Sequence, residues 1–368
     1  MNKLRFSKSE IVVILLTCTL VVLGCIFVYS ASSYAADYRY HNPYFFLIKQ
    51  IIGAVLGFLA MILFTFIDYH LLKKYKWWVL LVSVIFLVLV FVPGFGVQSF
   101  GANRWVNLFG LSIQPSEIAK FALVLFLASF LSENYQKIKS FKTLLFPLLV
   151  AAVLCGLVIL EPSMSVTMCL ALVTFCMLII GGIHSKHALL FCGLGAMGVP
   201  ALILAEPYRM KRLFAFLNPW ASPKGEGFQL IQSLYALGNG GLFGVGLFNS
   251  RQKYLFLPFA ESDFIFSIIG EEIGLFGCLF LLSIYAALVV CLFKIGLSAK
   301  DRFGCLLSCG VGLVIAIQTL LNVAVVTGSI PPTGLPLPFI SAGSTSLVVF
   351  MSSIGVVLNV NKQSKSMA

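Results

Sequence analysis

The chain has 368 residues, of which 60% are hydrophobic and only 10% charged, and its mean hydropathy is +1.02. Soluble domains are about 45–50% apolar and about 25% charged, so a soluble or disordered protein of this composition is excluded. The formal net charge is +12. It does not indicate nucleic-acid binding, because the basic residues lie mostly in short segments between apolar runs, as in the loops of membrane proteins.

Apolar runs that are long enough to cross a membrane recur along the whole chain. A helix needs roughly 20 apolar residues to cross the hydrocarbon, and it satisfies its own backbone polar groups there. About ten segments meet this description: 11–30, 46–67, 77–95, 116–132, 144–160, 165–182, 187–205, 264–295, 304–327 and 341–360. The sequence predicts an all-α polytopic membrane protein with about ten transmembrane helices, residues 1–368 forming a single transmembrane domain.

Lysine and arginine set the expected orientation. With the N-terminus in the cytoplasm, the inner segments hold most basic residues and the short outer loops almost none, and an even number of spans returns the C-terminus to the cytoplasm. A large outer loop, about 206–263, lies between the seventh and eighth helices. Loops of this length are usually functional or disordered, and its amphipathic stretch 228–242 predicts ordered structure at the membrane surface.

Cysteine and histidine do not indicate a metal site. All ten cysteines fall within apolar runs and lack the spacing of metal ligands, so they are interpreted as small apolar residues in helices. The pair His184 and His187 is interpreted as part of a solvated loop. No metal site is therefore predicted.

Charges near the fourth span are the first functional candidates, because charges within spans are expensive. Glu117 and Lys120 are three residues apart and share one helix face. They form either an ion pair at the helix entrance or a polar pair lining an outer cavity. Arg104, in the preceding loop, either reaches lipid headgroups or binds a phosphate. Trp105 lies at interface depth, where aromatic anchors are common.

Three acids mark the eighth span. Asp263, immediately before it, is either a helix cap or a carboxylate that accepts a proton from a hydroxyl beside a basic loop. Glu271 and Glu272 lie deeper, where acids usually face the protein interior and pair with other groups.

A proline-rich segment joins the ninth and tenth spans. Four prolines fall within residues 331–338 and forbid a regular helix there. Irregular backbone at membrane depth is tolerated where it lines a cavity. Ser341 opens a run of small hydroxyl residues that either caps the next helix or hydrogen-bonds a polar substrate.

Taken in order, several motifs resemble one family, the SEDS proteins (shape, elongation, division and sporulation), typified by FtsW and RodA. The resemblance covers roughly residues 90–358. The motifs are GANRW at 101–105, QPSE at 114–117, PYR at 207–209, NPW at 218–220, GFQ at 227–229 with QS at 232–233, SDFIF at 262–266, GEE at 270–272 and PTGLPLP at 332–338. Segments 215–220 and 250–253 are more similar to the division branch, FtsW, than to RodA.

The resemblance implies a peptidoglycan glycosyltransferase of the bacterial cytoplasmic membrane, placed at the division site. Such a protein polymerises lipid II into β-1,4 glycan strands beside a class B penicillin-binding protein and other division proteins. The family's catalytic aspartate falls on Asp263. Its arginine and its transmembrane Glu and Lys positions fall on Arg104, Glu117 and Lys120.

This sequence departs from the family pattern in three places. Residues 258–262 read PFAES where the family often has Pro-Glu-x-x-Thr. Residues 161–163 read EPS where many relatives carry Pro-Asp. Residues 341–346 read SAGSTS in place of the usual Ser-Tyr-Gly-Gly-Ser-Ser. These differences concern substrate contacts rather than the aspartate. No role is assigned to Glu261.

The implied reaction is an inverting glycosyl transfer. The 4-hydroxyl of the acceptor attacks the anomeric carbon of the growing chain, and undecaprenyl pyrophosphate leaves. This chemistry needs one base, predicted to be Asp263, and cations at the leaving group. The predicted pyrophosphate partners are Arg104, Lys120, Arg209, Arg212 and Lys253, and Trp105, Glu117, Gln252 and Ser341 complete the predicted substrate-binding set. Assistance by a divalent cation, Mg²⁺ or Mn²⁺, stays open.

Two other functions compete with this interpretation. A lipid II flippase needs polar groups that reach both leaflets, whereas the candidates here cluster on the outer side and no internal repeat is evident. A non-catalytic scaffold that recruits a cross-linking partner predicts that Asp263→Asn is tolerated.

Overall fold

The structure is a computed structural model that describes residues 7–99, 102–108, 111–161, 163–204, 206–332 and 334–366. Gly101, Pro162 and Thr333, which belong to the motifs above, lie outside the described residues. The elements in chain order are α1 (Lys8–Tyr40), α2 (Phe45–Phe66), α3 (Tyr69–Lys74), α4 (Lys76–Leu89), β1 (Gly96–Ser99), β2 (Ala102–Leu108), β3 (Leu111–Ile113), α5 (Pro115–Glu133), α6 (Phe141–Leu160), α7 (Met164–Gly181), α8 (Ser185–Leu204), α9 (Pro207–Leu217), η1 (Pro219–Ala221), α10 (Phe228–Gly240), α11 (Ile265–Leu297), α12 (Arg302–Val326) and α13 (Ser344–Ser366).

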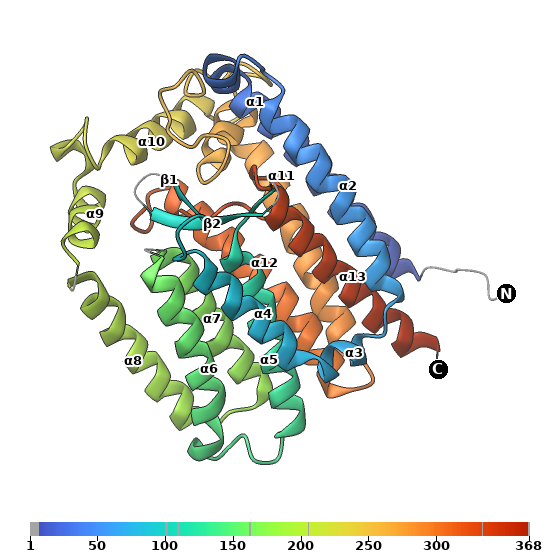
Figure 1. Cartoon of the computed structure of the whole chain (residues 1–368). Helices are drawn as coiled ribbons and strands as arrows, with labels where there is room; N and C mark the ends of the chain where they lie inside the picture. Colours follow the sequence, from blue (N-terminus) through green and yellow to red (C-terminus); the bar gives the residue numbers. More distant parts are fainter. Residues whose placement is uncertain are drawn as a thin grey trace.

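Long apolar helices make up the body of the molecule (Figure 1). Within the described residues, eight helices are long and apolar enough to cross a membrane, namely α1, α2, α5, α6, α7, α11, α12 and α13. This confirms the predicted class, a helical polytopic membrane protein. The other two expected spans correspond to α8, with 20 residues, and α4, with 14. The number of crossings stays a prediction.

Two predicted boundaries were wrong. The first helix begins at Lys8 because Ser7 and Glu10 form a capping box, and it continues to Tyr40 rather than residue 30. At 1.5 Å per residue it is roughly 50 Å long, so one end projects beyond the hydrocarbon. The third apolar run was expected to stay helical to residue 95, but α4 ends at Leu89, shortly before Pro93 and Gly94, which has a φ of 91°.

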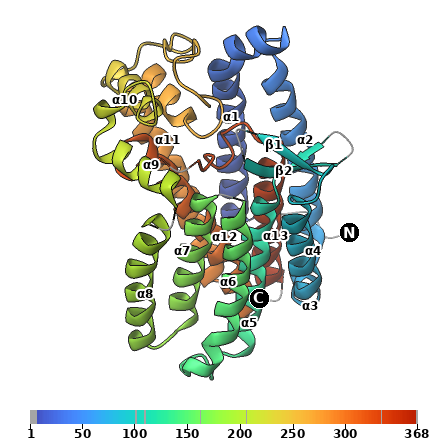
Figure 2. The ribbon, with the colours of Figure 1, turned by 60° about the vertical axis from the view of Figure 1, so that its left-hand side comes forward.

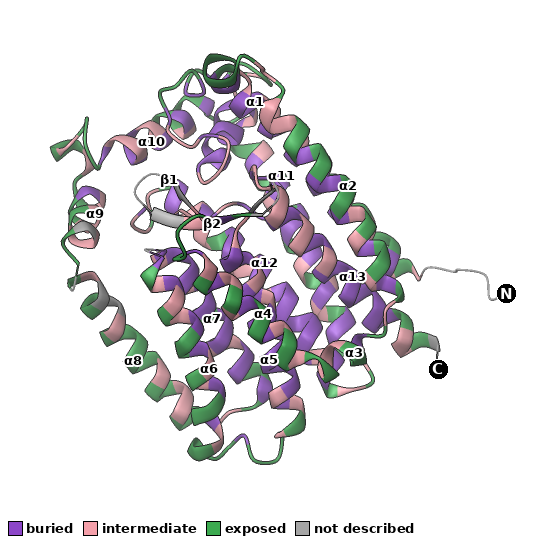
Figure 3. Ribbon diagram, viewed as in Figure 1, coloured by how far each residue is buried: buried purple, intermediate pink, exposed green. Residues whose placement is uncertain are grey.

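The core lies between α5, α12 and α13. The helix α12 packs against α11, α5 and α7, and α13 packs mainly on α2. Figure 3 shows buried residues concentrated on these central helices and exposed residues along the outer sides of α2 and α8. The backbones of α13 and α2 approach closely, because a Cβ on Gly355 would come within 2.3 Å of the Met61 carbonyl oxygen. Small residues permit such packing in membranes, where lipid competes for apolar surface.

One end of the bundle, here called the loop face, carries β1–β3, α9 and α10 (Figure 2). The strands form an antiparallel sheet in the order β1-β2-β3, with Val97 opposite Trp105 and Val106 opposite Ile113. The sequence predicted helices only, so this sheet is a correction. Its strands are too short for a period-2 pattern to stand out. Residues 206–263 are largely ordered, and α10 confirms the predicted amphipathic stretch.

The beginning of α1 and the end of α13 both lie away from the loop face in Figures 1 and 2. This agrees with the expectation that the termini share one side of the membrane. Which side is cytoplasmic stays a prediction.

A break in α11 shapes the loop face. Gly274 has a φ of 66° and a ψ of −170°, which interrupts the helix. The freed backbone pairs with the segment that follows α10: Leu275 N–H donates to the Gly241 carbonyl at 2.9 Å, and Val245 N–H donates to the Glu271 carbonyl at 2.9 Å. Glycine is needed here because a side chain at positive φ is strained.

Candidate active site

Asp263 lies in the turn immediately before α11 and is half-buried. The N-cap of α11 is Phe264, and no side chain caps the helix, so the capping alternative for Asp263 was wrong. Asn322 of α12 holds the turn, because its Nδ2 donates to the main-chain oxygen of Asp263 at 2.8 Å and to that of Leu335 at 2.7 Å. The carboxyl group of Asp263 therefore does not cap α11 and is available for chemistry.

The surroundings of Asp263 make its carboxylate a stronger base than that of an ordinary aspartate. Burial raises the pKa of its carboxyl from 3.8 to about 6, with Arg104 and Arg212 opposing the rise and the charge of Glu261 adding to it. A general base works best when its pKa is close to the ambient pH. Asp263 is therefore suited to accepting a proton near neutral pH.

Two cations from distant parts of the chain are anchored around Asp263. Arg104 lies on β2, and its Nε donates to the main-chain oxygen of Glu161 at 3.2 Å. Arg212 lies on α9, and its Nη1 donates to the Pro332 carbonyl at 3.2 Å. Both positive charges act on Asp263. The sheet and α9 therefore bring a pair of guanidinium groups, which bind phosphates well, to the same centre as the carboxylate.

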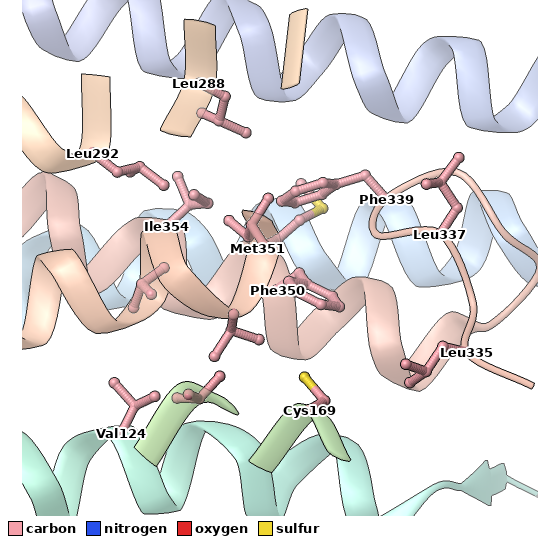
Figure 4. Close-up of a cluster of buried hydrophobic side chains, with 14 of the residues drawn as sticks. Val124, Cys169, Leu288, Leu292, Leu335, Leu337, Phe339, Phe350, Met351 and Ile354 are labelled. Carbon is pink, nitrogen blue, oxygen red and sulfur yellow. The ribbon is translucent and has the colours of Figure 1, made fainter. Parts of the chain in front are cut away.

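The proline-rich segment also packs against Asp263. Gly334 has a φ of 42°, and a Cβ there would stand 2.9 Å from Oδ2 of Asp263. Figure 4 shows Leu335, Leu337 and Phe339 of this segment pointing into the apolar core, toward Phe350 of α13.

Polar side chains from three helices satisfy the backbone of this segment. Gln318 Nε2 donates to the Pro336 carbonyl at 2.8 Å, and the Tyr285 hydroxyl donates to the Pro338 carbonyl. On the third helix, Gln50 Nε2 donates to the main-chain oxygen of Ser341 at 3.4 Å. Irregular backbone inside a membrane protein requires such partners.

Glu117 and Lys120 lie beneath the proline-rich segment with 0% side-chain exposure. Lys120 Nζ lies 2.7 Å from Oε1 of Glu117 and also donates to Gln318 Oε1. Ser346 Oγ donates to Oε2 of Glu117 at 2.9 Å. Of the two alternatives above, this placement favours the stabilising ion pair. Its link to the site runs through Gln318, whose amide nitrogen holds Pro336.

The two acids of α11 face the protein interior and are paired, as predicted. Oε1 of Glu271 accepts from the backbone N–H of Arg251, and Oε2 from that of Gln252, each at 3.2 Å. Gln252 is buried, and its side-chain oxygen has no hydrogen-bond partner. Glu271 therefore fixes the start of the segment that leads to Asp263.

Lys253 is tied to the second acid. Its Nζ lies 3.3 Å from Oε1 of Glu272, 3.3 Å from Ser30 Oγ and 2.6 Å from the Phe248 carbonyl oxygen. Only 5% of the side chain is exposed. This geometry joins α1, α11 and the outer segment, and it favours a supporting role for Lys253 over a contact with pyrophosphate.

The remaining predicted site residues fall into two groups. Ser341 links the proline-rich segment to the residue before Asp263. Its Oγ donates to the Ser262 carbonyl at 2.6 Å and accepts from the Leu337 N–H at 2.7 Å. Trp105 on β2 and Arg209 on α9 are half-buried at the loop face. Substrate contact by any of the predicted residues stays a prediction.

Sequence reasoning missed two polar residues that shape the site, Gln318 and Asn322, and noted a third, Glu161, without choosing it as the base. Gln318 and Asn322 are four residues apart on an apolar helix, a signal that intramembrane polar residues offer. Glu161 follows α6, is 1% exposed, and neither of its carboxyl oxygens has a hydrogen-bond partner. Burial raises the pKa of Glu161 to about 8, and the Arg104 charge partly offsets the rise.

The fold and the site together define an integral membrane protein with a candidate general base and two guanidinium groups at one face. The chain belongs to the cell cycle protein family of FtsW, RodA and SpoVE, whose sequence model matches residues 10–366. The resemblance inferred from the motifs is thereby confirmed.

Similar proteins include members of more than one branch. The chain is 38% identical to stage V sporulation protein E of Bacillus subtilis over 360 residues, covering 98% of each chain. It is 38% identical over 368 residues to a protein named probable peptidoglycan glycosyltransferase FtsW of Geobacter sp. strain M18, covering 99% of this chain and 100% of that one.

Solved structures share the fold over nearly the full length. One chain comes from work on the structural coordination of polymerization and crosslinking by a peptidoglycan synthase complex, with a TM-score of 0.80, 28% identity, and coverage of 96% of this chain and 97% of that chain. The Thermus thermophilus rod shape determining protein RodA superposes with a TM-score of 0.71 at 25% identity, covering 99% of both chains.

Proposed function

We propose that this protein is a peptidoglycan glycosyltransferase that polymerises lipid II during cell division. One observation carries the proposal: two anchored guanidinium groups at the loop face act on a carboxylate whose pKa is raised to about 6. Family membership and relatives named as peptidoglycan glycosyltransferases support it.

The proposed mechanism uses one base and two cations. Asp263 accepts the proton of the acceptor's 4-hydroxyl while that oxygen attacks the anomeric carbon of the growing chain. The bond from this carbon to pyrophosphate breaks on the opposite face, so the configuration inverts, and the leaving group takes the bonding electrons. Arg104 and Arg212 stabilise the charge that develops on it. No acid is required, because pyrophosphate is a good leaving group.

The other paired residues hold this centre rather than react. The Glu117–Lys120 pair supports the proline-rich segment through Gln318, and Ser341 ties that segment to the residue before Asp263. Preorganised groups lower the barrier because they need not rearrange during the reaction.

In this proposal, Mg²⁺ or Mn²⁺ would at most assist the glycosyl transfer. Among the described residues, no three His, Cys, Asp or Glu side chains gather into a metal-binding group. No step above passes through a metal ion. Polymerisation after treatment with EDTA, with and without added Mg²⁺ or Mn²⁺, tests the need for one.

The partners and the location follow from the same proposal. The substrates are lipid II and the growing strand, and the setting is the bacterial cytoplasmic membrane at the division site, with the loop face outside. A class B penicillin-binding protein and other division proteins are the expected protein partners. The similarity to a chain of a peptidoglycan synthase complex supports the first of these.

The placement of the site disfavours the two rivals. A flippase needs polar groups that serve both leaflets, but Asp263, Arg104 and Arg212 all lie at the loop face. A scaffold needs no carboxylate with a pKa near neutrality.

The deciding experiment measures lipid II polymerisation by the purified full chain with its cognate class B penicillin-binding protein. Wild type is compared with Asp263→Asn and with Asp37→Asn, a control that neutralises an exposed acid at the end of α1. Strands from wild type and the control, but not from folded Asp263→Asn, are expected. Strands from all three would remove Asp263 from the chemistry. Transport of lipid II across liposomes without strands would favour the flippase.

A further inference from the structure

A cavity of about 220 Å³ opens between the projecting end of α1 and residues 253–261, and the mechanism above does not use it. Its lining includes Ala35, Tyr38 and Arg39 of α1, and Pro258, Phe259 and Glu261 of the outer segment. The cavity is linked to the reaction centre through Glu261, which lies two residues before Asp263 and whose charge acts on it. It faces α1, whereas Arg104 and Arg212 come from β2 and α9.

The lining has the chemistry of a site for a small, uncharged polar ligand. Ligand pockets combine apolar or aromatic walls with a few polar groups, and here Tyr38, Pro258 and Phe259 supply walls. Glu261 and Arg39 supply one acceptor and one donor group of opposite charge, and the Arg39 charge acts on the Glu261 carboxyl. The balanced charge suits a sugar better than a phosphate.

The Glu261 carboxylate can accept further hydrogen bonds. Within the described residues its side chain takes a hydrogen bond only from its own backbone N–H. Its main chain is held in place, because Ala342 N–H donates to the Glu261 carbonyl at 2.9 Å. A fixed backbone with an available carboxyl is an arrangement that a ligand hydroxyl can complete.

The cavity wall is also held in an unfavourable backbone conformation. Leu255 and Phe259, which both line the cavity, have φ angles of 67° and 57°. Bulky residues rarely adopt such angles, which are strained and cluster at ligand-binding sites. Hydrogen bonds of Glu271 and the Lys253–Glu272 pair fix the start of this segment. Its shape is thus imposed before any ligand arrives.

Different cations act on Asp263 and on the cavity, and an inverting transfer can use that difference. Arg104 and Arg212 act on Asp263, whereas Arg39 acts on Glu261. In an inverting transfer the nucleophile approaches the face opposite to the leaving group. If pyrophosphate lies with Arg104 and Arg212, the acceptor sugar lies on the side of the cavity.

We propose that this cavity is the subsite for the acceptor amino sugar, in which Glu261 accepts a hydrogen bond from a sugar hydroxyl and Arg39 donates one to the acetamido oxygen. The inference rests on the proposed glycosyl transfer and deepens it. It also gives a role to the carboxylate that distinguishes the PFAES sequence at 258–262 from the family pattern.

The test uses two forms of lipid II, one that acts only as donor and one that acts only as acceptor. Lipid II whose 4-hydroxyl is blocked acts only as donor, and a lipid II analogue with a non-leaving phosphonate in place of the pyrophosphate acts only as acceptor. Formation of one glycosidic bond is measured at pH 8, where Asp263 is ionised in all variants. Glu261→Ala and Arg39→Ala are expected to raise the acceptor KM about tenfold, the loss expected for one hydrogen bond to a charged group. The donor KM should stay within about threefold.

Matched variants separate this role from a structural one. Ala35→Phe fills the cavity without changing charge and should also raise the acceptor KM selectively, whereas Asp37→Asn, on the same helix, should leave both KM values unchanged. Glu261→Gln keeps the shape of the side chain if Glu261→Ala melts early. An unchanged acceptor KM, or equal rises for donor and acceptor, overturns the subsite while the polymerase proposal stands. A wild type that forms no glycosidic bond overturns both.

Discussion

Acidification is the most informative perturbation, because the proposed base works only when ionised. Burial raises the pKa of Asp263 to about 6. The reactive carboxylate is therefore lost as the pH falls through this value and is complete well above it. With a pKa of about 6, roughly a tenth of the molecules are ionised at pH 5 and roughly nine-tenths at pH 7. The rate should therefore rise about tenfold between these pH values. An aspartate with the ordinary pKa would give almost no change.

The assay is kcat/KM for formation of one glycosidic bond by the full chain with its partner, measured from pH 5 to 8.5. Two variants should move the midpoint in opposite directions. Glu261→Gln removes a negative charge and lowers the pKa of Asp263, so the midpoint moves to lower pH. Arg104→Gln removes a positive charge and moves the midpoint to higher pH, with a lower plateau because the leaving group loses a cation.

The outcome that refutes this reasoning is specific. A rate that is flat between pH 5 and 7 would show that no group with the raised pKa acts in the rate-limiting step. Loss of the acidic limb in Glu261→Gln would assign that limb to Glu261 rather than Asp263. Thermal unfolding at each pH serves as the control for acid denaturation.

Three further predictions concern the groups around the base. Lys120→Met leaves the Glu117 carboxylate buried without its cation and should destabilise the fold by about 3–5 kcal/mol, which is measured as a lower Tm in detergent. Adding Glu117→Gln should restore part of the lost stability. Equal Tm values for wild type and Lys120→Met would contradict the pairing. Gly334→Ala strains a positive φ and places a methyl 2.9 Å from the Asp263 carboxyl, so kcat should fall at least tenfold and Tm should fall modestly because of the strain. Arg212→Gln should lower kcat/KM at every pH and shift the acidic limb upward, and a variant with wild-type kinetics would exclude a contact with the leaving group.

Much of the fold could be predicted from the sequence because membrane helices carry a local signal. Roughly 20 apolar residues in a row specify a span wherever they occur, and the amphipathic pattern of α10 was equally local. The sheet was missed because three short strands leave no such signal. The length of α1 was missed because the helix continues past the apolar run to a left-handed cap at His41.

The candidate site divides in the same way. Asp263 and the charges at 104, 117 and 120 stand out in the sequence because charges near spans are costly and several belong to motifs. Their roles depend on packing. Lys120 and Lys253 each meet a buried carboxylate and serve as supports, while Arg104 and Arg212 act on Asp263.

The sequence by itself determined that this is a helical membrane protein of one recognisable family with an aspartate at the start of a span. Only the tertiary structure decided which cations surround that aspartate. Arg104, Arg212 and Asp263 belong to a strand, a surface helix and a turn that are far apart in the chain. Their meeting depends on how those elements pack, and so does the desolvation that moves the pKa of Asp263 toward neutrality. No pattern along the chain encodes either quantity, because both arise from neighbours in space.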